Sequence, residues 1–508
     1  MRTFARNIDR LMIPDNFLGT RLVKGGIPAE KMKKNVNPFF VDDYQPCYEP
    51  GEFILYVGRL VRQKGVFTLI RAMSLLSNEG PPMDKTAERG RYQFGVKDKR
   101  RPCGLESNPQ SGLTTRAAFV TNICPHYRVK TFETLAQKLS VKFFFYSAGN
   151  ERYWQQSHGV RAGNFSHDYL PGFQVTQSTR VVLSLPTRLW RGSYDVIIKC
   201  INGRFALPVT YVTARLTGKP FVLWTGIWMS LQTPFHRLVF PLTRWIYRHA
   251  DAIVVYGEHV KRYLVGLNVA PKKIFVAAHA VDNSQYNREI SEGEKAALRE
   301  RLGLGNHKIV LYIGRLEEEK GMEYLTKAFA LLKADNVALV IVGDGSMQQR
   351  LTDLVLEQGL RERTRFVGYV SPEEALTYYS IAECFVLPSV TTRNGKEPWG
   401  LVVNEAMNQG LPVIAKEAVG AAAGGLVQPG VNGLIVPERD SEALAQAMRR
   451  ILLDENLRRR MSHNAQQIVA SWDNARMVKG FEEAIEYAVR RNRRSGAGHK
   501  SLPVYENN

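Results

Sequence analysis

The sequence of 508 residues has few cysteines, and these form no recognisable pattern. Its five cysteines include no Cys-x-x-Cys pair, which argues against a disulfide scaffold or a zinc ribbon and favours a reducing compartment. Long apolar runs are also missing, because the nearest candidate, residues 205–228, is interrupted by Arg215 and Lys219. The first residues contain no apolar segment of the kind found in secretory signals. We therefore expect a soluble or peripheral protein.

Acidic residues are scarce in one part of the chain. The whole sequence has 69 Lys and Arg against 48 Asp and Glu, a net charge of +21. Residues 114–250 hold 17 Lys and Arg against four acids, a net of +13. A basic face of this kind suits nucleic acid, an anionic membrane or a phosphorylated substrate. No zinc-finger, RNA-recognition or helix-turn-helix signature accompanies it, so we do not expect nucleic acid as a partner.

An internal repeat is the clearest feature of the chain's organisation. Residues 53–76 resemble residues 309–332, and both segments contain a Gly-Arg-Leu triplet followed by a Lys-Gly pair. The first copy stops near residue 78, whereas the second continues, so we interpret residues 1–78 as a truncated, partial Rossmann-like domain. We interpret this copy as a remnant, with a docking role as the alternative. Residues 79–113 are rich in Pro, Gly and charge, and predict a disordered linker.

Apolar strand-like runs alternate with helix-like segments from residue 114 onward. This alternation predicts an α/β fold built on parallel sheets with crossover helices. We expect two doubly wound Rossmann-like domains that face a cleft, over residues 114–280 and 281–470. A helix over 471–492 is expected to pack back across the domains, and residues 493–508 form a tail.

Two segments of the last domain place glycine and cations directly after strands. Gly314 and Arg315 follow a predicted strand, and Lys320 comes five residues later. Arg315 and Lys320 are suited to clamp a diphosphate, although a solvated pair on a turn is the alternative. Gly343 and Gly345 form a Gly-x-Gly turn after the next strand, but without the full GxGxxG spacing a nicotinamide site is not supported.

Two glutamates lie eight positions apart around a glycine turn. Glu397 is expected on a loop, and Glu405 about two turns along a helix that begins after Gly400. Carboxylates suit hydroxyl-rich ligands because their oxygens accept hydrogen bonds from vicinal hydroxyl groups. Since ligands of open parallel sheets bind beyond the carboxyl ends of the strands, these segments are expected to converge.

Taken in order, these motifs resemble a known family, the retaining nucleotide-sugar glycosyltransferases of GT-B type, family 4 (glycosyl transferases group 1). The resemblance covers residues 114–490 and is strongest over 309–440. Five motifs carry it: Gly-Arg-Leu with Lys-Gly at 314–321, Val-Gly-Asp-Gly at 342–345, the Glu-x7-Glu segment at 397–407, Gly-Leu-Pro-Val-Ile at 410–414, and Pro-Gly with Asn-Gly-Leu-Ile-Val at 429–436.

The resemblance implies a role for each matching residue. Arg315 and Lys320 would hold the donor diphosphate, Glu397 would contact the donor sugar, and Glu405 would bind the ribose hydroxyls. The acceptor proton would pass to the departing diphosphate, so that no protein base, metal or cofactor is required beyond the nucleoside diphosphate sugar itself. Donor binding is also implied for six further positions: Gly314, Gly343, Gly345, Gly400, Leu401 and Val402.

The acceptor side departs from the family pattern. The loop after the first strand of the acceptor domain has no glycine, and His126 and Arg128 are its candidate acceptor contacts. A histidine that many members place after residues 221–224 is missing, and His236 is the nearest substitute. Three arginines fall near one face of a helix over 235–248, which fits an anionic membrane surface as well as a solvated face.

The leading hypothesis is therefore a metal-independent, hexosyltransferase-type enzyme that transfers a sugar to a glycan or lipid-linked acceptor with retention. It would act in polysaccharide biosynthesis for the cell envelope, in the cytoplasm or at the inner face of the cytoplasmic membrane. Two alternatives stay open. The missing histidine allows a non-catalytic paralogue that binds nucleotide sugar or a protein partner. The charge alone allows a basic scaffold for nucleic acid or membrane.

Overall fold

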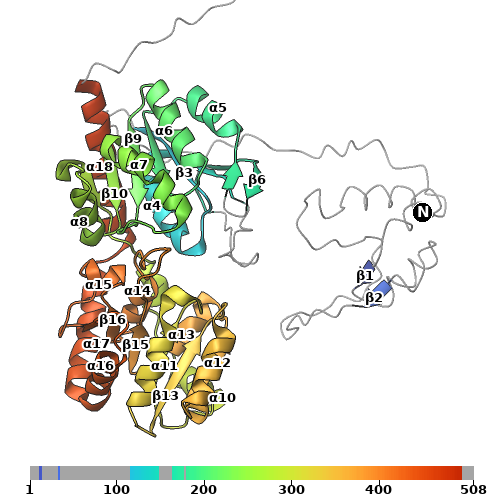
Figure 1. Ribbon diagram of the computed structural model, residues 1–508, viewed down its shortest axis with the longest axis vertical. Coiled ribbons are helices and arrows are strands. Elements are labelled where there is room, and N and C mark those ends of the chain that lie inside the picture. Colours follow the sequence, from blue (N-terminus) through green and yellow to red (C-terminus); the bar gives the residue numbers. More distant parts are fainter. Residues whose placement is uncertain (1–10, 14–31, 35–114, 148–162, 177–178, 495–508) are drawn as a thin grey trace, which may run out of the picture. The chain divides into compact units, whose positions relative to one another are not determined.

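The computed structural model, shown in Figure 1, divides into two compact units, Met1–Ser107 and Asn108–Asn508. In the first unit, the strands β1 (Leu11–Ile13) and β2 (Met32–Lys34) pair in parallel. The predicted repeat copy at 53–76 and the predicted linker lie outside the described residues. The structure describes five segments: 11–13, 32–34, 115–147, 163–176 and 179–494.

A sheet of seven parallel strands forms the centre of what we call the first lobe. The strand order is β11-β10-β9-β8-β3-β4-β5, so the chain reverses its direction of winding between β3 and β8. β8, β9 and β10 are buried along their whole length, as expected for central strands of a parallel sheet with both faces covered. The strands are β3 (Arg116–Thr121), β4 (Ser140–Phe145), β5 (His167–Tyr169), β8 (Val196–Cys200), β9 (Phe221–Thr225), β10 (Ala252–Val255) and β11 (Ile274–Val276).

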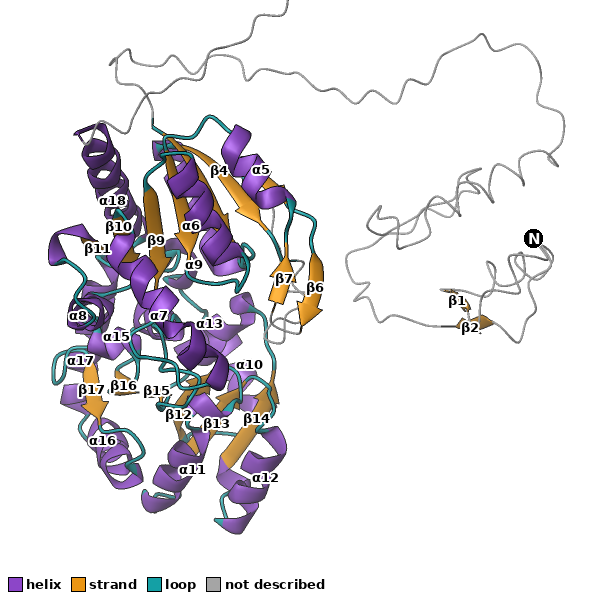
Figure 2. Cartoon of the chain, turned by 45° about the horizontal axis from the view of Figure 1, so that its top comes forward, coloured by secondary structure: helices purple, strands orange, loops and turns teal. Residues whose placement is uncertain are grey.

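Helices connect these strands, and a short antiparallel pair of strands stands apart from the sheet (Figure 2). The pair consists of β6 (Phe173–Thr176) and β7 (Thr179–Val181). The connecting helices are η4 (His126–Arg128), α4 (Val129–Lys138), α5 (Ser184–Arg191), α6 (Ala206–Leu216), α7 (Pro234–His249), α8 (Glu258–Gly266) and η5 (Pro271–Lys273).

A second sheet of six parallel strands forms the second lobe. Its order is β14-β13-β12-β15-β16-β17, with the reversal between β12 and β15. Its strands are β12 (Lys308–Ile313), β13 (Val337–Val342), β14 (Thr364–Gly368), β15 (Cys384–Leu387), β16 (Val413–Lys416) and β17 (Gly433–Val436). Its helices are α9 (Asn283–Tyr286), α10 (Glu292–Arg301), η6 (Glu318–Lys320), α11 (Met322–Leu331), α12 (Gln348–Glu357), η7 (Arg361–Arg363), α13 (Pro372–Ser380), α14 (Val402–Asn408), α15 (Gly420–Ala423), α16 (Ser441–Leu453) and α17 (Glu455–Ala470).

The last helix, α18 (Asn474–Arg494), returns to the first lobe (Figure 1). It packs against α4, β10 and β11, and the Phe481 ring lies 5.3 Å from the Trp224 ring. Gly480 allows this approach, because a Cβ atom there would lie 2.5 Å from the carbonyl oxygen of Val276. Helix α18, which follows the second lobe in the chain, therefore packs against the first lobe. Among the described residues, no helix has the length and apolar character that crossing a bilayer requires.

The two doubly wound sheets predicted from the alternation are confirmed. A capping box begins α13, in which Ser371 and Glu374 satisfy each other's backbone amides. Parallel strands bring their carboxyl ends to one edge, and the loops at a reversal point leave a crevice there. In each lobe this edge carries the loops that line the site described next.

Candidate active site

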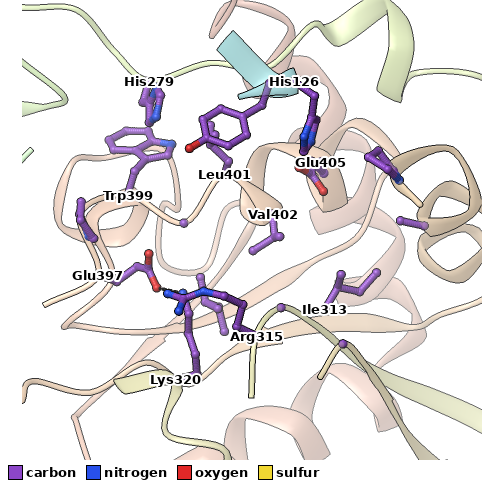
Figure 3. Close-up of a pocket in the computed structure, with 18 of the residues that line it drawn as sticks. His126, His279, Ile313, Arg315, Lys320, Glu397, Trp399, Leu401, Val402 and Glu405 are labelled. Carbon is purple, nitrogen blue, oxygen red and sulfur yellow. Dashed lines mark hydrogen bonds and ion pairs between the residues drawn. The ribbon is translucent and has the colours of Figure 1, made fainter. Parts of the chain in front are cut away.

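A cavity of about 600 Å³ lies between the carboxyl ends of the two sheets. The first lobe contributes loops that follow β3, β8, β9 and β10, and the second lobe contributes loops that follow β12 to β15. Both reversal points therefore open into one space. Eleven of the residues singled out in the sequence line it: His126, Arg128, Gly314, Arg315, Lys320, Gly343, Glu397, Gly400, Leu401, Val402 and Glu405. Ten of the lining residues are labelled in Figure 3.

The loops after β12 and β13 approach each other so closely that they require glycine. Gly343 has a φ of +123°, and a Cβ atom on it would lie 2.0 Å from the carbonyl oxygen of Gly314. A Cβ atom on Gly345 would lie 2.4 Å from the carbonyl oxygen of Leu316, and Gly345 does not line the cavity. The Gly-x-Gly turn thus joins two loops, and only its first glycine reaches the cavity.

Lys320 and Glu397 form a buried ion pair on the second-lobe wall. Their side chains are 13% and 12% exposed, and Lys320 Nζ donates to Glu397 Oε2. Ser389 Oγ donates to the same oxygen at 3.2 Å. Burial alone would raise the pKa of Glu397, but Lys320, Ser389 and Arg315 together hold this pKa below its usual value. Glu397 is therefore ionised at neutral pH.

Arg315 lies beside this pair at a more exposed place. Its side chain is 42% exposed, and its Nη2 lies 3.3 Å from Glu319 Oε1. Figure 3 shows the Arg315 side chain beside Lys320 and Glu397. An exposed ion pair contributes little, so Arg315 can turn toward an anionic ligand at small cost. Arg315 and Lys320 together make this wall a suitable place for a diphosphate.

The loop that carries Glu397 is held by the first lobe. Trp228 Nε1 donates to the carbonyl oxygen of Glu397 at 3.1 Å, and His259 Nε2 donates to that of Pro398 at 3.1 Å. Burial lowers the pKa of His259 to about 4, which keeps the ring neutral. Gly420 packs beneath the loop, since a Cβ atom there would lie 2.1 Å from the carbonyl oxygen of Pro398. The position of Glu397 therefore depends on both lobes.

Glu405 lies in the first turn of α14, because this helix begins at Val402. The sequence prediction of two turns along the helix was wrong for this reason. Tyr379 Oη donates to Glu405 Oε2 at 2.9 Å, and the Tyr286 hydroxyl also hydrogen-bonds to this carboxyl group. Burial raises the pKa of Glu405 to about 7. A ligand that donates further hydrogen bonds would favour the ionised form.

The first-lobe wall presents mostly neutral groups. His126 and Arg128 come from η4, directly after β3, and Asn202 follows β8. Asn202 Nδ2 donates to Asn122 Oδ1 at 2.7 Å, which joins the loops on either side of the reversal point. The buried Lys199 Nζ supports the same loop through the carbonyl oxygen of Asn202 at 2.7 Å.

His236 does not reach this cavity. It lines a neighbouring hollow of about 320 Å³ between α6 and α7, and its Nδ1 lies 2.5 Å from Thr233 Oγ1 at the start of α7. The loop after β9 presents Gly226 and Ile227 to the main cavity instead of a histidine. The hollow is lined mostly by apolar side chains, among them Leu207, Phe235, Val239, Phe240, Leu242 and Ile246.

Sequence reasoning missed Tyr286 and His279, which line the main cavity, and Tyr379, which is buried and contacts Glu405 without lining the cavity. Tyr286 and Tyr379 hold Glu405, and His279 lies in the segment that connects the lobes. His279 is buried, its Nδ1 has no hydrogen-bond partner among the described residues, and burial lowers its pKa well below the usual value. Tyrosines on helices are common in protein cores, so the hydrophobic periodicity of the sequence does not indicate that Tyr286 and Tyr379 contact Glu405.

Two family models match consecutive parts of the chain. Residues 134–285 match "Glycosyltransferase Family 4", and residues 294–468 match "Glycosyl transferases group 1". Over 271 residues the chain is 31% identical to the alpha-D-kanosaminyltransferase of Streptomyces kanamyceticus, which covers 51% of this chain and 68% of the relative.

Two further similarities extend this result. Over 166 residues the chain is 33% identical to a GDP-mannose-dependent alpha-(1-6)-phosphatidylinositol monomannoside mannosyltransferase of Mycobacterium tuberculosis, which covers 32% of this chain and 43% of the relative. The crystal structure of Anabaena HepE in complex with UDP-glucose shares the fold, with a TM-score of 0.57 at 20% identity, over 73% of this chain and 99% of that one.

Proposed function

The chain belongs to the glycosyl transferases group 1 family and has the GT-B fold, and on that premise we propose a specific reaction. The protein transfers a sugar from a nucleoside diphosphate sugar to a glycan or lipid-linked acceptor, with retention of the anomeric configuration. One observation carries this proposal: two cations and two carboxylates of the second lobe converge in one cavity that the first lobe closes.

The second lobe holds the donor in this proposal. Arg315 and Lys320 bind the diphosphate, and Glu405 accepts hydrogen bonds from the ribose hydroxyls. Glu397 contacts the donor sugar, because the ion pair with Lys320 places its carboxylate beside the diphosphate position. Anabaena HepE, whose crystal structure was determined in complex with UDP-glucose, supports a nucleoside diphosphate sugar as the donor class.

The two cations also act on the leaving group. Charge develops on the diphosphate as the bond to the sugar breaks, and preorganised cations stabilise such charge in a site that excludes water. We propose that Arg315 and Lys320 perform this task without a divalent metal. The departing diphosphate oxygen takes the proton of the acceptor hydroxyl on the same face of the sugar. The new bond then forms on the face that the diphosphate leaves, which gives retention.

The first lobe holds the acceptor in this proposal. His126 and Arg128 face the donor side across the cavity, and the apolar hollow beside α7 offers room for the apolar part of a lipid-linked acceptor. Leu238 and Leu242 of α7 are 80% and 49% exposed, and Arg237 is exposed beside them. This surface supports peripheral binding to an anionic membrane at its cytoplasmic face. We propose further that the product is part of an envelope polysaccharide.

The test is turnover with a panel of nucleoside diphosphate sugars and a mixed glycan and lipid-linked acceptor pool. We expect release of one nucleoside diphosphate, an NMR product spectrum that shows retention, and loss of turnover in Glu397→Gln. Glu362→Gln is the matched control, because Glu362 is exposed on η7 and does not line the cavity. Inversion in the product would contradict the proposed chemistry.

A second candidate function rests on the loop after β9. This loop brings Gly226 and Ile227 to the cavity where many family members are expected to place a histidine, and His236 lies in the other hollow. A non-catalytic protein that binds nucleotide sugar would show this loss. It predicts nucleotide binding without turnover for every donor in the panel, and any turnover excludes it.

A further inference from the structure

Arg128 occupies an unusual position in the first-lobe wall. It is the last residue of η4, lines the main cavity, and is 9% exposed. Its Nη2 donates to Tyr256 Oη at 2.8 Å, and its guanidinium carbon lies 4.3 Å from the centre of the Trp224 ring. The same carbon lies 5.8 Å from the centre of the Tyr127 ring, so the side chain is fixed in place by one neutral hydrogen bond and two aromatic faces.

No acidic residue in the described part of the chain forms an ion pair with this buried cation. Tyr256, Tyr127 and Cys124 lie close enough to influence Arg128, and burial raises the pKa of each, so all three are neutral at pH 7. Its Nε atom is buried and has no hydrogen-bond partner among the described residues. Buried charges in proteins are normally paired, because an isolated ion loses its hydration without compensation. The cation–π contacts with Trp224 and Tyr127 offset only part of this cost.

The surrounding wall does not supply the missing charge. The first-lobe residues that line the cavity include no Asp or Glu, whereas the second-lobe wall includes three acids. Those acids are Asp344, Glu397 and Glu405, and Glu397 is already paired with Lys320. An anionic ligand in the cavity would meet Arg128 in a poorly hydrated place, where a charge-assisted hydrogen bond is strong.

We propose that Arg128 binds an anionic group of the acceptor, a phosphate or a carboxylate, and thereby selects acceptors that carry one. This inference rests on the proposed glycosyltransferase function and specifies its acceptor class. Arg128 follows β3 at the reversal point of the first sheet, on the opposite wall from Arg315 and Lys320. The donor diphosphate is already paired with Arg315 and Lys320 on the second-lobe wall. The negative charge that pairs with Arg128 therefore comes from the acceptor.

The experiment is thermal unfolding of the full chain with inorganic phosphate or acetate as the probe, at constant ionic strength set with NaCl. Four proteins are compared: wild type, Arg128→Met, Lys320→Met and the control Arg188→Gln, whose side chain is exposed on α5. We expect at least one of the two anions to stabilise the wild type and the control. Affinity for that anion should fall about 10- to 100-fold in Arg128→Met and persist in Lys320→Met. Comparing phosphate with acetate identifies which anion the acceptor presents.

A panel of UDP, GDP, ADP and CMP, added to the same proteins, separates this proposal from the proposed function. Nucleotide stabilisation should persist in Arg128→Met and be lost in Lys320→Met. If a nucleotide binds but the anion effect is lost only in Lys320→Met, the anion occupies the donor diphosphate position and the acceptor proposal fails. If no nucleotide binds, the donor site itself is refuted, whatever the anion result. If neither anion stabilises the wild type, the acceptor proposal fails.

A measurement without a variant covers the case in which Arg128→Met does not fold. Anion titration of the wild type is repeated at saturating nucleotide. Separate sites predict that the two shifts add, whereas competition for one diphosphate site predicts that the anion shift disappears. Loss of additivity would overturn the proposal.

Discussion

The buried pair of Lys320 and Glu397 should be energetically coupled far beyond a surface ion pair. Lys320→Met leaves a carboxylate that is 12% exposed with Ser389 as its hydrogen-bond donor and Arg315 nearby. Breaking a buried pair from one side costs about 3–5 kcal/mol of stability, and because Ser389 remains as a donor we expect this variant to lose about 3 kcal/mol. The double variant Lys320→Met with Glu397→Gln buries neither charge of this pair. Its loss in free energy of unfolding should therefore be about 2 kcal/mol smaller than the sum of the losses in the two single variants.

The assay is a double-mutant cycle read by native-state hydrogen exchange of the β12 and β15 amides, which reports the local free energy of opening. The exposed pair of Glu455 and Arg459 is the matched control, with side chains 56% and 75% exposed. Its coupling should stay below about 1 kcal/mol. If the two pairs show equal coupling energies, burial does not strengthen the interaction between Lys320 and Glu397.

The pH dependence of stability should change sign between the wild type and Lys320→Met. In the wild type the pKa of Glu397 lies below its unfolded value, so its stabilisation is present above that value and is lost as the pH falls through the folded pKa. Without Lys320, burial dominates and raises the pKa of Glu397. Lys320→Met should therefore gain stability as the pH falls toward 4, while the wild type loses it.

Three other perturbations have defined outcomes. The pKa of Glu405 is raised to about 7, and the ionised carboxylate is the form that accepts hydrogen bonds from the ribose, so nucleotide affinity should fall about tenfold per pH unit below 7. Calorimetry measures this slope, and Glu405→Gln should bind weakly and show no such slope. Gly420→Ala places a Cβ atom 2.1 Å from the carbonyl oxygen of Pro398, so it should displace the Glu397 loop and weaken nucleotide binding at least tenfold. Gly480→Ala places a Cβ atom 2.5 Å from the carbonyl oxygen of Val276, so urea denaturation should show a loss of about 1–3 kcal/mol, without a change in nucleotide affinity.

Two glycines provide controls for these substitutions. Gly293 and Gly266 have no atom within 4 Å of an added Cβ, so alanine should be neutral or slightly stabilising at both. If Gly420→Ala behaves like these controls, the close packing under the Glu397 loop is not what positions that residue.

The architecture was accessible from sequence because its strands are buried on both faces. Runs such as 309–313 and 338–342 lie in β12 and β13, and they are apolar throughout because helices cover the sheet. Short edge strands gave weaker signals, and β5 and β11 were not predicted. Each has three residues, too few for a periodic pattern.

The site was only partly accessible. Motifs predicted nine of the second-lobe residues that line the cavity, because glycine and charge directly after strands mark one sheet edge, but they also predicted Gly345, which does not line it. Contacts between lobes left no pattern: Trp228 and His259 hold the Glu397 loop through backbone carbonyls, which any residue provides. His236 was chosen by its place in the sequence, and the geometry of α7 carries it to the other hollow.

The central claim is that the cavity binds a nucleoside diphosphate through Arg315, Lys320 and Glu405. Thermal unfolding of the full chain with UDP, GDP, ADP and CMP tests it most directly. A nucleotide at about 100 times its dissociation constant should stabilise the protein by about 2.7 kcal/mol, a shift of a few degrees. We expect a shift with one nucleoside diphosphate that is lost in Lys320→Met and reduced in Glu405→Gln. The proposed donor site is contradicted if no nucleotide shifts a cooperative unfolding transition. It is also contradicted if the nucleotide-induced shift is unchanged in both variants.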